Sequence, residues 1–169
     1  MIQIYTGNGK GKTTAALGLA MRAVGHGLTV IMIQFMKGQV KYGELEAAKS
    51  LPNFTIEQYG RPNLVDPDNP DKEDIRLAQE AWKRAKEVIT SGEYDMIILD
   101  EINVAVAFGL IASKEVIELL RRVPKRIELI LTGRYMPETF AQYADLISDI
   151  REVKHHFQKG ASARRGIEY

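Results

Sequence analysis

The chain has no cysteine among its 169 residues. This absence excludes disulfide bonds, thiolate nucleophiles and thiolate metal sites, and it is compatible with a reducing compartment. The chain also lacks a large excess of positive or negative side chains. Its 23 Lys and Arg side chains are balanced by 22 Asp and Glu side chains, for a formal net charge of +1. Such a balance gives no overall attraction to nucleic acid or to a membrane surface, so we expect neither as a partner.

Long hydrophobic runs are missing as well. The longest apolar region, residues 15–35, is interrupted by Arg22, His26 and glycines, and it is therefore unsuited to spanning a bilayer. The N-terminus lacks the layout of a signal peptide, because a polar glycine-rich stretch follows Ile2–Tyr5 at once. Since the composition is that of an ordinary globular protein, we expect one cytoplasmic domain over residues 1–169.

What the sequence contains is an alternation of short β-type runs with longer helical stretches. We predict strands at Ile2–Tyr5, Thr29–Phe35, Phe54–Tyr59, Met96–Glu101, Ile127–Thr132 and Leu146–Val153. We predict helices at Lys12–Val24, at Glu44–Leu51 and from about Pro70 onward, the last with an apolar stripe of Ile75, Ala78, Trp82, Ala85 and Ile89. This order predicts an α/β fold, a mostly parallel sheet flanked by helices on both faces.

The first predicted strand runs into YTGNGKGKTT, Tyr5–Thr14. A P-loop requires glycine, four arbitrary residues and then Gly-Lys-Ser/Thr. Gly11, Lys12 and Thr13 satisfy the second half, whereas the first glycine position falls on Thr6 and Gly7 comes one residue late. The motif's context, a strand before the loop and a helix after it, is present. We therefore predict a P-loop NTPase-like fold whose loop binds phosphate, against the alternative of a glycine turn with incidental lysines.

A second motif, MIILDE at residues 96–101, is an apolar run that ends in an acidic pair. Asp100 and Glu101 are candidate ligands of Mg²⁺ or Mn²⁺, with the Thr13 hydroxyl as a third, and a helix cap is the alternative reading of the pair. Lys12 would neutralise phosphate charge. By themselves these motifs leave open an ATPase or small-molecule kinase, in which Glu101 orients a nucleophile and Arg134 stabilises the leaving charge.

The whole chain resembles the P-loop type of ATP:corrinoid adenosyltransferase, the cob(I)alamin or cob(I)yrinic acid a,c-diamide adenosyltransferase family. The resemblance is carried by the opening YTGNGKGKTTAALGLAMRAVGHG, by VIMIQFMKG, by the LDE strand end, by LTGR and by the final VKHHFQKGASARRGIEY. It implies an enzyme that transfers the 5′-deoxyadenosyl group of ATP to Co(I) of a reduced corrinoid and releases tripolyphosphate. It also implies a homodimer and a separate electron donor that generates Co(I).

The resemblance further implies roles for individual residues. ATP would lie across the loop with the ribose C5′ exposed, so that its triphosphate is the leaving group. The expected ATP-binding residues are Gly7, Asn8, Gly9, Lys10, Gly11, Lys12, Thr13, Thr14 and Arg22, the expected catalytic residues are Lys12 and Arg134, and the expected metal ligands are Thr13, Asp100 and Glu101. Because Co(I) is already a strong nucleophile, catalysis would come from alignment and charge stabilisation. Gln34, Lys37 and Glu44 are further candidates for the rim of the site.

This sequence departs from the family in two places. Longer members carry an N-terminal extension that helps to close the site, and we expect no such lid here. Better-known members place a Phe and a Trp in the loop after the third strand, against the lower face of the corrinoid. Here that loop reads YGRPNLVDPDNP, so Tyr59, Leu64 and Val65 are the candidates for an apolar wall, while Trp82 is expected in the core.

The C-terminal tail is basic, with Lys154, Lys159, Arg164 and Arg165. We expect it near ATP or in solvent, and mobile before ligand binds. His155 and His156 are not expected to bind cobalt, since a strong axial donor disfavours Co(I). A nucleotide-dependent protein that binds corrinoid without turnover is a third, non-enzymatic alternative.

Overall fold

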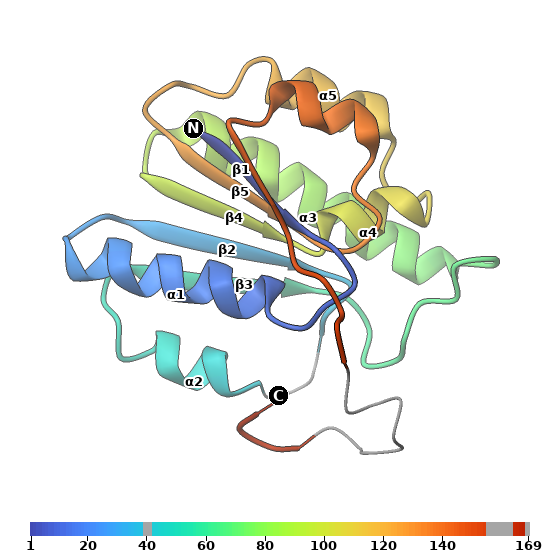
Figure 1. Cartoon of the computed structure of the whole chain (residues 1–169), viewed down its shortest axis with the longest axis horizontal. Helices are drawn as coiled ribbons and strands as arrows, with labels where there is room; N and C mark the ends of the chain where they lie inside the picture. Colours follow the sequence, from blue (N-terminus) through green and yellow to red (C-terminus); the bar gives the residue numbers. More distant parts are fainter. Residues whose placement is uncertain (39–41, 155–163, 168–169) are drawn as a thin grey trace.

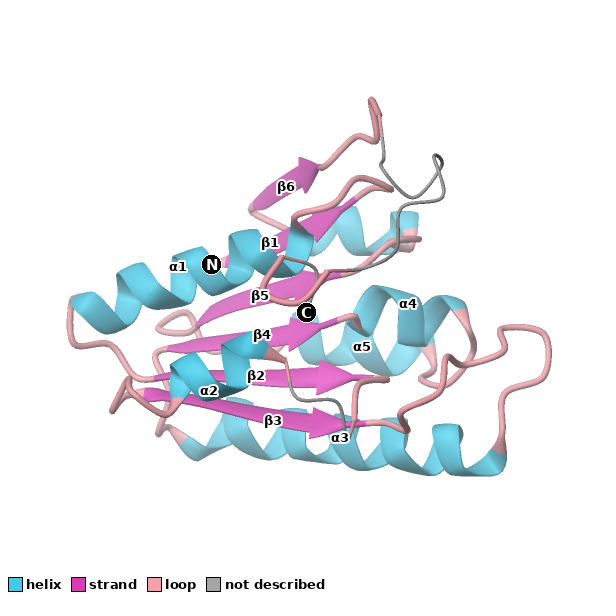
Figure 2. Ribbon diagram, turned by 90° about the horizontal axis from the view of Figure 1, so that it is seen from below, coloured by secondary structure: helices cyan, strands magenta, loops and turns pink. Residues whose placement is uncertain are grey.

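One six-stranded sheet runs through the computed structural model, which describes residues 1–38, 42–154 and 164–167. The strands are β1 (Ile2–Thr6), β2 (Val30–Phe35), β3 (Phe54–Tyr59), β4 (Met96–Asp100), β5 (Glu128–Thr132) and β6 (Leu146–Asp149), in the order β3-β2-β4-β5-β1-β6. All the pairings between these strands are parallel. The carboxyl ends of the strands therefore share one edge of the sheet, as the arrowheads in Figure 2 show.

Helices cover both faces of the sheet, as predicted. Helices α1 (Lys12–Gly25) and α2 (Gly43–Ala48) pack on one face, and α3 (Lys72–Ser91), α4 (Ile102–Ala107) and α5 (Ser113–Leu120) pack on the other (Figure 1). Successive strand residues alternate between the two layers, so that Ile98 joins α1 in one core while Ile97 and Leu99 join α3 in the other. Burial on both faces explains the near-continuous apolar runs. No described helix has the length and apolarity needed to cross a membrane.

Some predicted boundaries were wrong. Strand β6 ends at Asp149 rather than Val153, because the Ile150 carbonyl leaves the sheet to accept a hydrogen bond from the Gly9 N–H at 2.7 Å. Strand β4 ends one residue early, since Glu101 adopts a left-handed backbone with φ 64°. Helices α4 and α5 and the short 3₁₀ helix η1 (Glu138–Tyr143) had not been predicted.

Helix α3 begins at Lys72, two residues after the predicted start, because the Asp71 side chain caps it by accepting the Glu73 N–H. The predicted apolar stripe is confirmed for Trp82, which is 1% exposed and in the core, and for Ala78, Ala85 and Ile89. Ile75 was wrongly included, since it is 41% exposed.

The two isoleucines of α3 provide a matched test of this packing. We predict that Ile89→Ala lowers the free energy of unfolding by about 2–5 kcal/mol, because it opens a cavity in the core. Ile75→Ala removes the same atoms from a partly exposed position and should cost about 0.5 kcal/mol or less. Urea unfolding followed by circular dichroism measures both, and equal losses in the two variants would contradict the assignment.

Candidate active site

The glycine loop connects β1 to α1 at the carboxyl edge of the sheet. Strand β1 continues through Thr6, which pairs with Asp149, and the turn begins at Gly7 with φ 95°. A Cβ atom on Gly7 would collide with the Asp149 side chain and the Ile150 backbone. This explains the irregular glycine spacing. Thr6 occupies the position of the usual first glycine, but it is still the last residue of β1, so the turn and its glycine come one residue later.

Lys12 is buried inside this loop. Its Nζ donates hydrogen bonds to the carbonyl oxygens of Gly7 at 2.8 Å and Gly9 at 2.7 Å. Burial lowers the pKa of the Lys12 ammonium, an effect that the Glu101 carboxylate opposes. Helix α1 starts without a capping side-chain hydrogen bond and without an acidic residue in its first turn. The N–H groups at its start are therefore available to an anion, as a phosphate site requires.

The Asp100 carboxylate at the end of β4 is completely buried and accepts four hydrogen bonds. Its Oδ1 accepts from the hydroxyls of Thr13 at 2.9 Å and Thr132 at 2.7 Å. Its Oδ2 accepts from the Lys37 Nζ at 2.7 Å and the Gln34 Nε2 at 3.2 Å. Burial alone would lower the pKa of Lys37, but the carboxylates of Asp100, Glu101 and Glu44 together outweigh it and the pKa is raised. Thus Asp100 joins four different segments of the chain.

Two of these donors belong to a polar row across the sheet. Gln58 of β3 donates to the Gln34 side chain at 2.9 Å, Gln34 of β2 donates to Asp100, and Thr132 of β5 donates to Asp100 from the other side. Sequence reasoning missed Gln58 and Thr132 and treated Gln34 only as a rim residue. The polar residue inside the buried run VIMIQF could have indicated such a row, because a buried amide needs a hydrogen-bond partner.

Glu101 follows Asp100 and is half-buried beside the loop. Its N–H donates to the Thr132 hydroxyl at 3.0 Å. Burial, and then the adjacent Asp100 carboxylate, raise the pKa of Glu101. The described non-glycine residues with positive φ are Met36, Glu101 and Tyr135, and all three follow strand ends at this edge. Left-handed backbone of this kind is concentrated at functional sites.

Arg134 reaches the same site from the segment after β5. The buried Asn103 of α4 donates from its Nδ2 to the Gly133 carbonyl at 3.1 Å, and this bond fixes the backbone next to Arg134. The Arg134 side chain is exposed. Its positive charge contributes to the lowered pKa of Lys12 and acts against the rise in the pKa of Glu101. The structure therefore brings together five predicted residues, namely Lys12, Thr13, Asp100, Glu101 and Arg134.

Other predicted residues lie around this centre or away from it. Asn8, Lys10 and Thr14 are exposed on the loop and the first turn of α1, and the Lys10 Nζ donates to the carbonyl of Ile167 at 3.2 Å. Arg22 is in the last turn of α1, about 15 Å along the helix axis from Lys12 at 1.5 Å per residue. The structure thus does not bring Arg22 to the loop. His155, His156 and Lys159 lie outside the described residues.

The donor set beside the loop fits a magnesium ion. The Thr13 hydroxyl and the Asp100 carboxylate are 2.9 Å apart, and Mg²⁺ prefers oxygen ligands of this kind. Within residues 1–38, 42–154 and 164–167 there is no cluster of three or more His, Asp or Glu that could hold a metal by itself. An ion here would therefore take its other ligands from phosphate and water, as is usual for Mg²⁺.

The candidates for an apolar wall lie at the end of β3 and in the loop that follows it. The Tyr59 hydroxyl donates to Glu57 at 2.9 Å, and burial together with Glu57 raises the pKa of Tyr59 to about 12. Val65 packs against the core, whereas Leu64 is 98% exposed. Arg61 anchors the loop to α3 through Asp74 at 2.6 Å. Of the three wall candidates, Leu64 is therefore the one with an exposed side chain.

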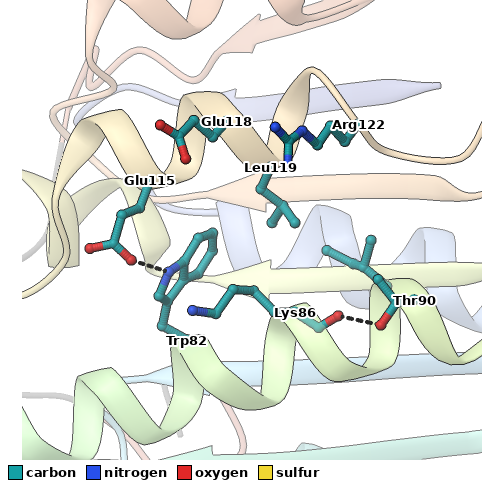
Figure 3. A pocket seen from close by; sticks show the side chains of 8 residues that line it. Trp82, Lys86, Thr90, Glu115, Glu118, Leu119 and Arg122 are labelled. Atoms are coloured by element: carbon teal, nitrogen blue, oxygen red, sulfur yellow. Dashed lines mark hydrogen bonds between the residues drawn. The ribbon is translucent and has the colours of Figure 1, made fainter.

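A groove of about 290 Å³ lies elsewhere, between α3 and α5 (Figure 3). It is lined by Trp82, Lys86, Ile89, Thr90, Glu115, Glu118, Leu119 and Arg122. Its α3 residues belong to the second half of that helix, which lies toward the amino ends of the strands, and its other residues belong to α5 and the turn after it. The Trp82 Nε1 donates to Glu115 at 3.0 Å in its wall. The groove is thus separate from the phosphate loop.

The raised pKa of Glu101 gives a testable pH dependence. The folded protein keeps the Glu101 proton to a higher pH than the unfolded chain does, so the free energy of unfolding falls as pH rises above the ordinary carboxyl value of 4.5. We predict that Glu101→Gln removes this fall and is more stable than the parent at neutral pH but equally stable near pH ~4. Urea unfolding with a chelator and without nucleotide measures this. A Glu101→Gln variant less stable than the parent at neutral pH would refute it.

Several known proteins are similar to this chain over its whole length. The corrinoid adenosyltransferase of Escherichia coli (strain K12) is 37% identical over 177 residues, covering 100% of this chain and 85% of that protein. The corrinoid adenosyltransferase CobA of Salmonella typhimurium (strain LT2) is 36% identical over 100% of this chain and 85% of its own length. The corrinoid adenosyltransferase of Sinorhizobium sp is 33% identical, with coverage of 100% and 80%.

Among solved structures, the KaiC-like protein PH0186 from Pyrococcus horikoshii OT3 aligns with 90% of this chain and 72% of its own, at a TM-score of 0.44 and 16% identity, a likeness too low to support any argument. The sequence model of the family described as ATP:corrinoid adenosyltransferase BtuR/CobO/CobP matches residues 1–169. This chain therefore belongs to the ATP:corrinoid adenosyltransferase BtuR/CobO/CobP family.

Proposed function

We propose that the protein transfers the 5′-deoxyadenosyl group of ATP to the Co(I) of a reduced corrinoid and releases tripolyphosphate. The observation that carries this proposal is the family match over residues 1–169. The geometry supports it, because the phosphate loop, the acidic end of β4 and Arg134 meet at one edge of the sheet. A site of this kind can hold a whole triphosphate in one orientation.

The reaction needs little covalent chemistry from the protein. An electron pair of Co(I) attacks the ribose C5′ and forms a carbon–cobalt bond. The bond from C5′ to the oxygen of the α-phosphate breaks, and tripolyphosphate leaves with the electron pair of this broken bond. Lys12 and the N–H groups at the start of α1 would hold the departing phosphates, and Arg134 would stabilise their charge. A magnesium ion held by Thr13 and Asp100 would supply further positive charge to the phosphates.

The alternatives are not favoured. An ATPase or small-molecule kinase would need only the phosphate loop and the acidic strand end, whereas the family match extends over the whole chain. A binding protein without turnover is not favoured either, because the similar proteins are named corrinoid adenosyltransferases, which are enzymes.

Finer properties are part of the same proposal. We infer that residues 1–169 act as a single adenosyltransferase domain in the cytoplasm, as a homodimer, with Mg²⁺ or Mn²⁺, and that a separate electron donor generates Co(I). The remaining loop residues Gly7, Asn8, Gly9, Lys10, Gly11 and Thr14 would contact the triphosphate, with Arg22 as a more distant ATP contact and Glu101 as a direct or water-mediated metal ligand. Leu64 would face the corrinoid, because its side chain is exposed on the loop after β3.

The products distinguish the proposal from its alternatives. Protein, Mg-ATP and a chemically reduced corrinoid are mixed without oxygen, and the visible spectrum and the phosphate products are followed. We expect a light-labile alkylcobalt spectrum together with tripolyphosphate. Accumulation of ADP without that spectrum would identify a phosphotransfer enzyme, and intact ATP would identify a binding protein.

Lys12 is the residue whose loss should matter most. We predict that Lys12→Ala reduces adenosylation by at least about 10²-fold, the usual effect of removing one donor to a developing negative charge. Lys83→Ala, which removes an exposed lysine of α3, is the matched control and should keep parental activity. Comparable rates for Lys12→Ala and Lys83→Ala would exclude Lys12 from the mechanism.

A further inference from the structure

Lys37 forms a buried ion pair with the carboxylate that would bind the metal. Its Nζ lies 2.7 Å from Asp100 Oδ2, and the side chains of Lys37 and Asp100 are 18% and 0% exposed. A buried carboxylate without a compensating cation is strongly unfavourable. Lys37 therefore serves as the counterion of Asp100 in the nucleotide-free protein.

The backbone around Lys37 is tightly fixed. Met36, which precedes it, has φ 56°. A Cβ atom on Gly60 would lie 2.5 Å from the Lys37 backbone nitrogen, so the loops after β2 and β3 touch at a point where only glycine fits. The long Lys37 side chain carries its charge on rotatable bonds, and its Nζ also lies 5.6 Å from the centre of the Tyr42 ring. A fixed backbone with a movable cation allows the ammonium to exchange partners.

A divalent ion beside Thr13 and the Lys37 ammonium compete for the charge of the same carboxylate. Asp100 Oδ1 is occupied by the two threonine hydroxyls, and Oδ2 is occupied by Lys37 and Gln34. An ion that binds Asp100 repels the Lys37 ammonium, which the carboxylates of Glu101 and Glu44 attract less strongly than Asp100 does, and the triphosphate would give that ammonium a new anionic partner. Metal binding and nucleotide binding are coupled for this reason.

We propose that Lys37 is an exchangeable counterion, which neutralises Asp100 before nucleotide binds and transfers to the triphosphate when a divalent metal takes its place. This inference rests on the proposed ATP site. Its consequence is that the metal binds poorly alone and well together with ATP. Lys37 thereby becomes a triphosphate-binding residue in addition to Lys12.

The test compares Lys37→Met with Lys49→Met, which removes an exposed lysine that forms an exposed ion pair with Glu46. Mn²⁺ without nucleotide is titrated by electron paramagnetic resonance, and Mg-ATP binding is measured by calorimetry. We expect Lys37→Met to bind Mn²⁺ alone about tenfold more tightly and Mg-ATP about tenfold more weakly, within the usual range of coupling between sites. Lys49→Met should match the parent in both.

A purely structural role of Lys37 would not make Mn²⁺ binding tighter while making Mg-ATP binding weaker. If Lys37→Met binds both ligands more weakly, or Mn²⁺ no more tightly than the parent, the exchange does not occur. Lys37→Arg keeps the cation and should restore the weak binding of Mn²⁺ alone, and circular dichroism establishes that each variant is folded. If Lys37→Met is unfolded, the parent protein is tested instead. In the parent, saturating ATP should tighten Mn²⁺ binding, and removal of the metal by a chelator should weaken ATP binding. Absence of this coupling would overturn the proposal. Neither measurement uses corrinoid, so failure of the adenosylation assay would leave this result interpretable.

Discussion

The buried carboxylate of Asp100 accepts hydrogen bonds from α1, β2, β5 and the loop after β2. Removing the ion-pair partner of a buried charge costs about 3–5 kcal/mol, and removing a neutral donor to it costs about 1.5–3 kcal/mol. Each of these segments is therefore held where its donor can reach Asp100. Thr13 thereby sets the start of α1, and Thr132 sets the end of β5, which leads to Arg134. The phosphate loop and Arg134 are consequently positioned by one carboxylate.

The loop itself is organised around Lys12. In the absence of ligand, the Lys12 ammonium is satisfied by the carbonyl oxygens of Gly7 and Gly9, and the start of α1 has no acidic side chain against it. A bound triphosphate would meet the ammonium and the N–H groups already oriented. An arrangement of this kind stabilises charge as it develops on a leaving group, and it suits a reaction in which the nucleophile needs no base. The site and the family therefore point to the same chemistry.

Much of the fold could be predicted from local sequence patterns. Strands such as Val30–Phe35 are recognisable because burial on both faces makes them continuously apolar. Helix α4 was missed because six residues are too few to display a helical period. The polar row could not be predicted, because it depends on strand order: Gln34 meets Asp100 only because β2 and β4 are neighbours in the sheet. Lys37 was a rim candidate, and its pairing with Asp100 depends on the same non-local arrangement.

The central claim is that the lysine-containing loop holds all three phosphates as one leaving group and leaves the ribose C5′ accessible. A crystal structure of the protein with Mg²⁺ and ATP, without corrinoid, tests this most directly. The account predicts the triphosphate within Gly7–Thr14 and the C5′ atom facing solvent at the carboxyl edge of the sheet. A structure in which C5′ is enclosed and the γ-phosphorus faces the open side would contradict it.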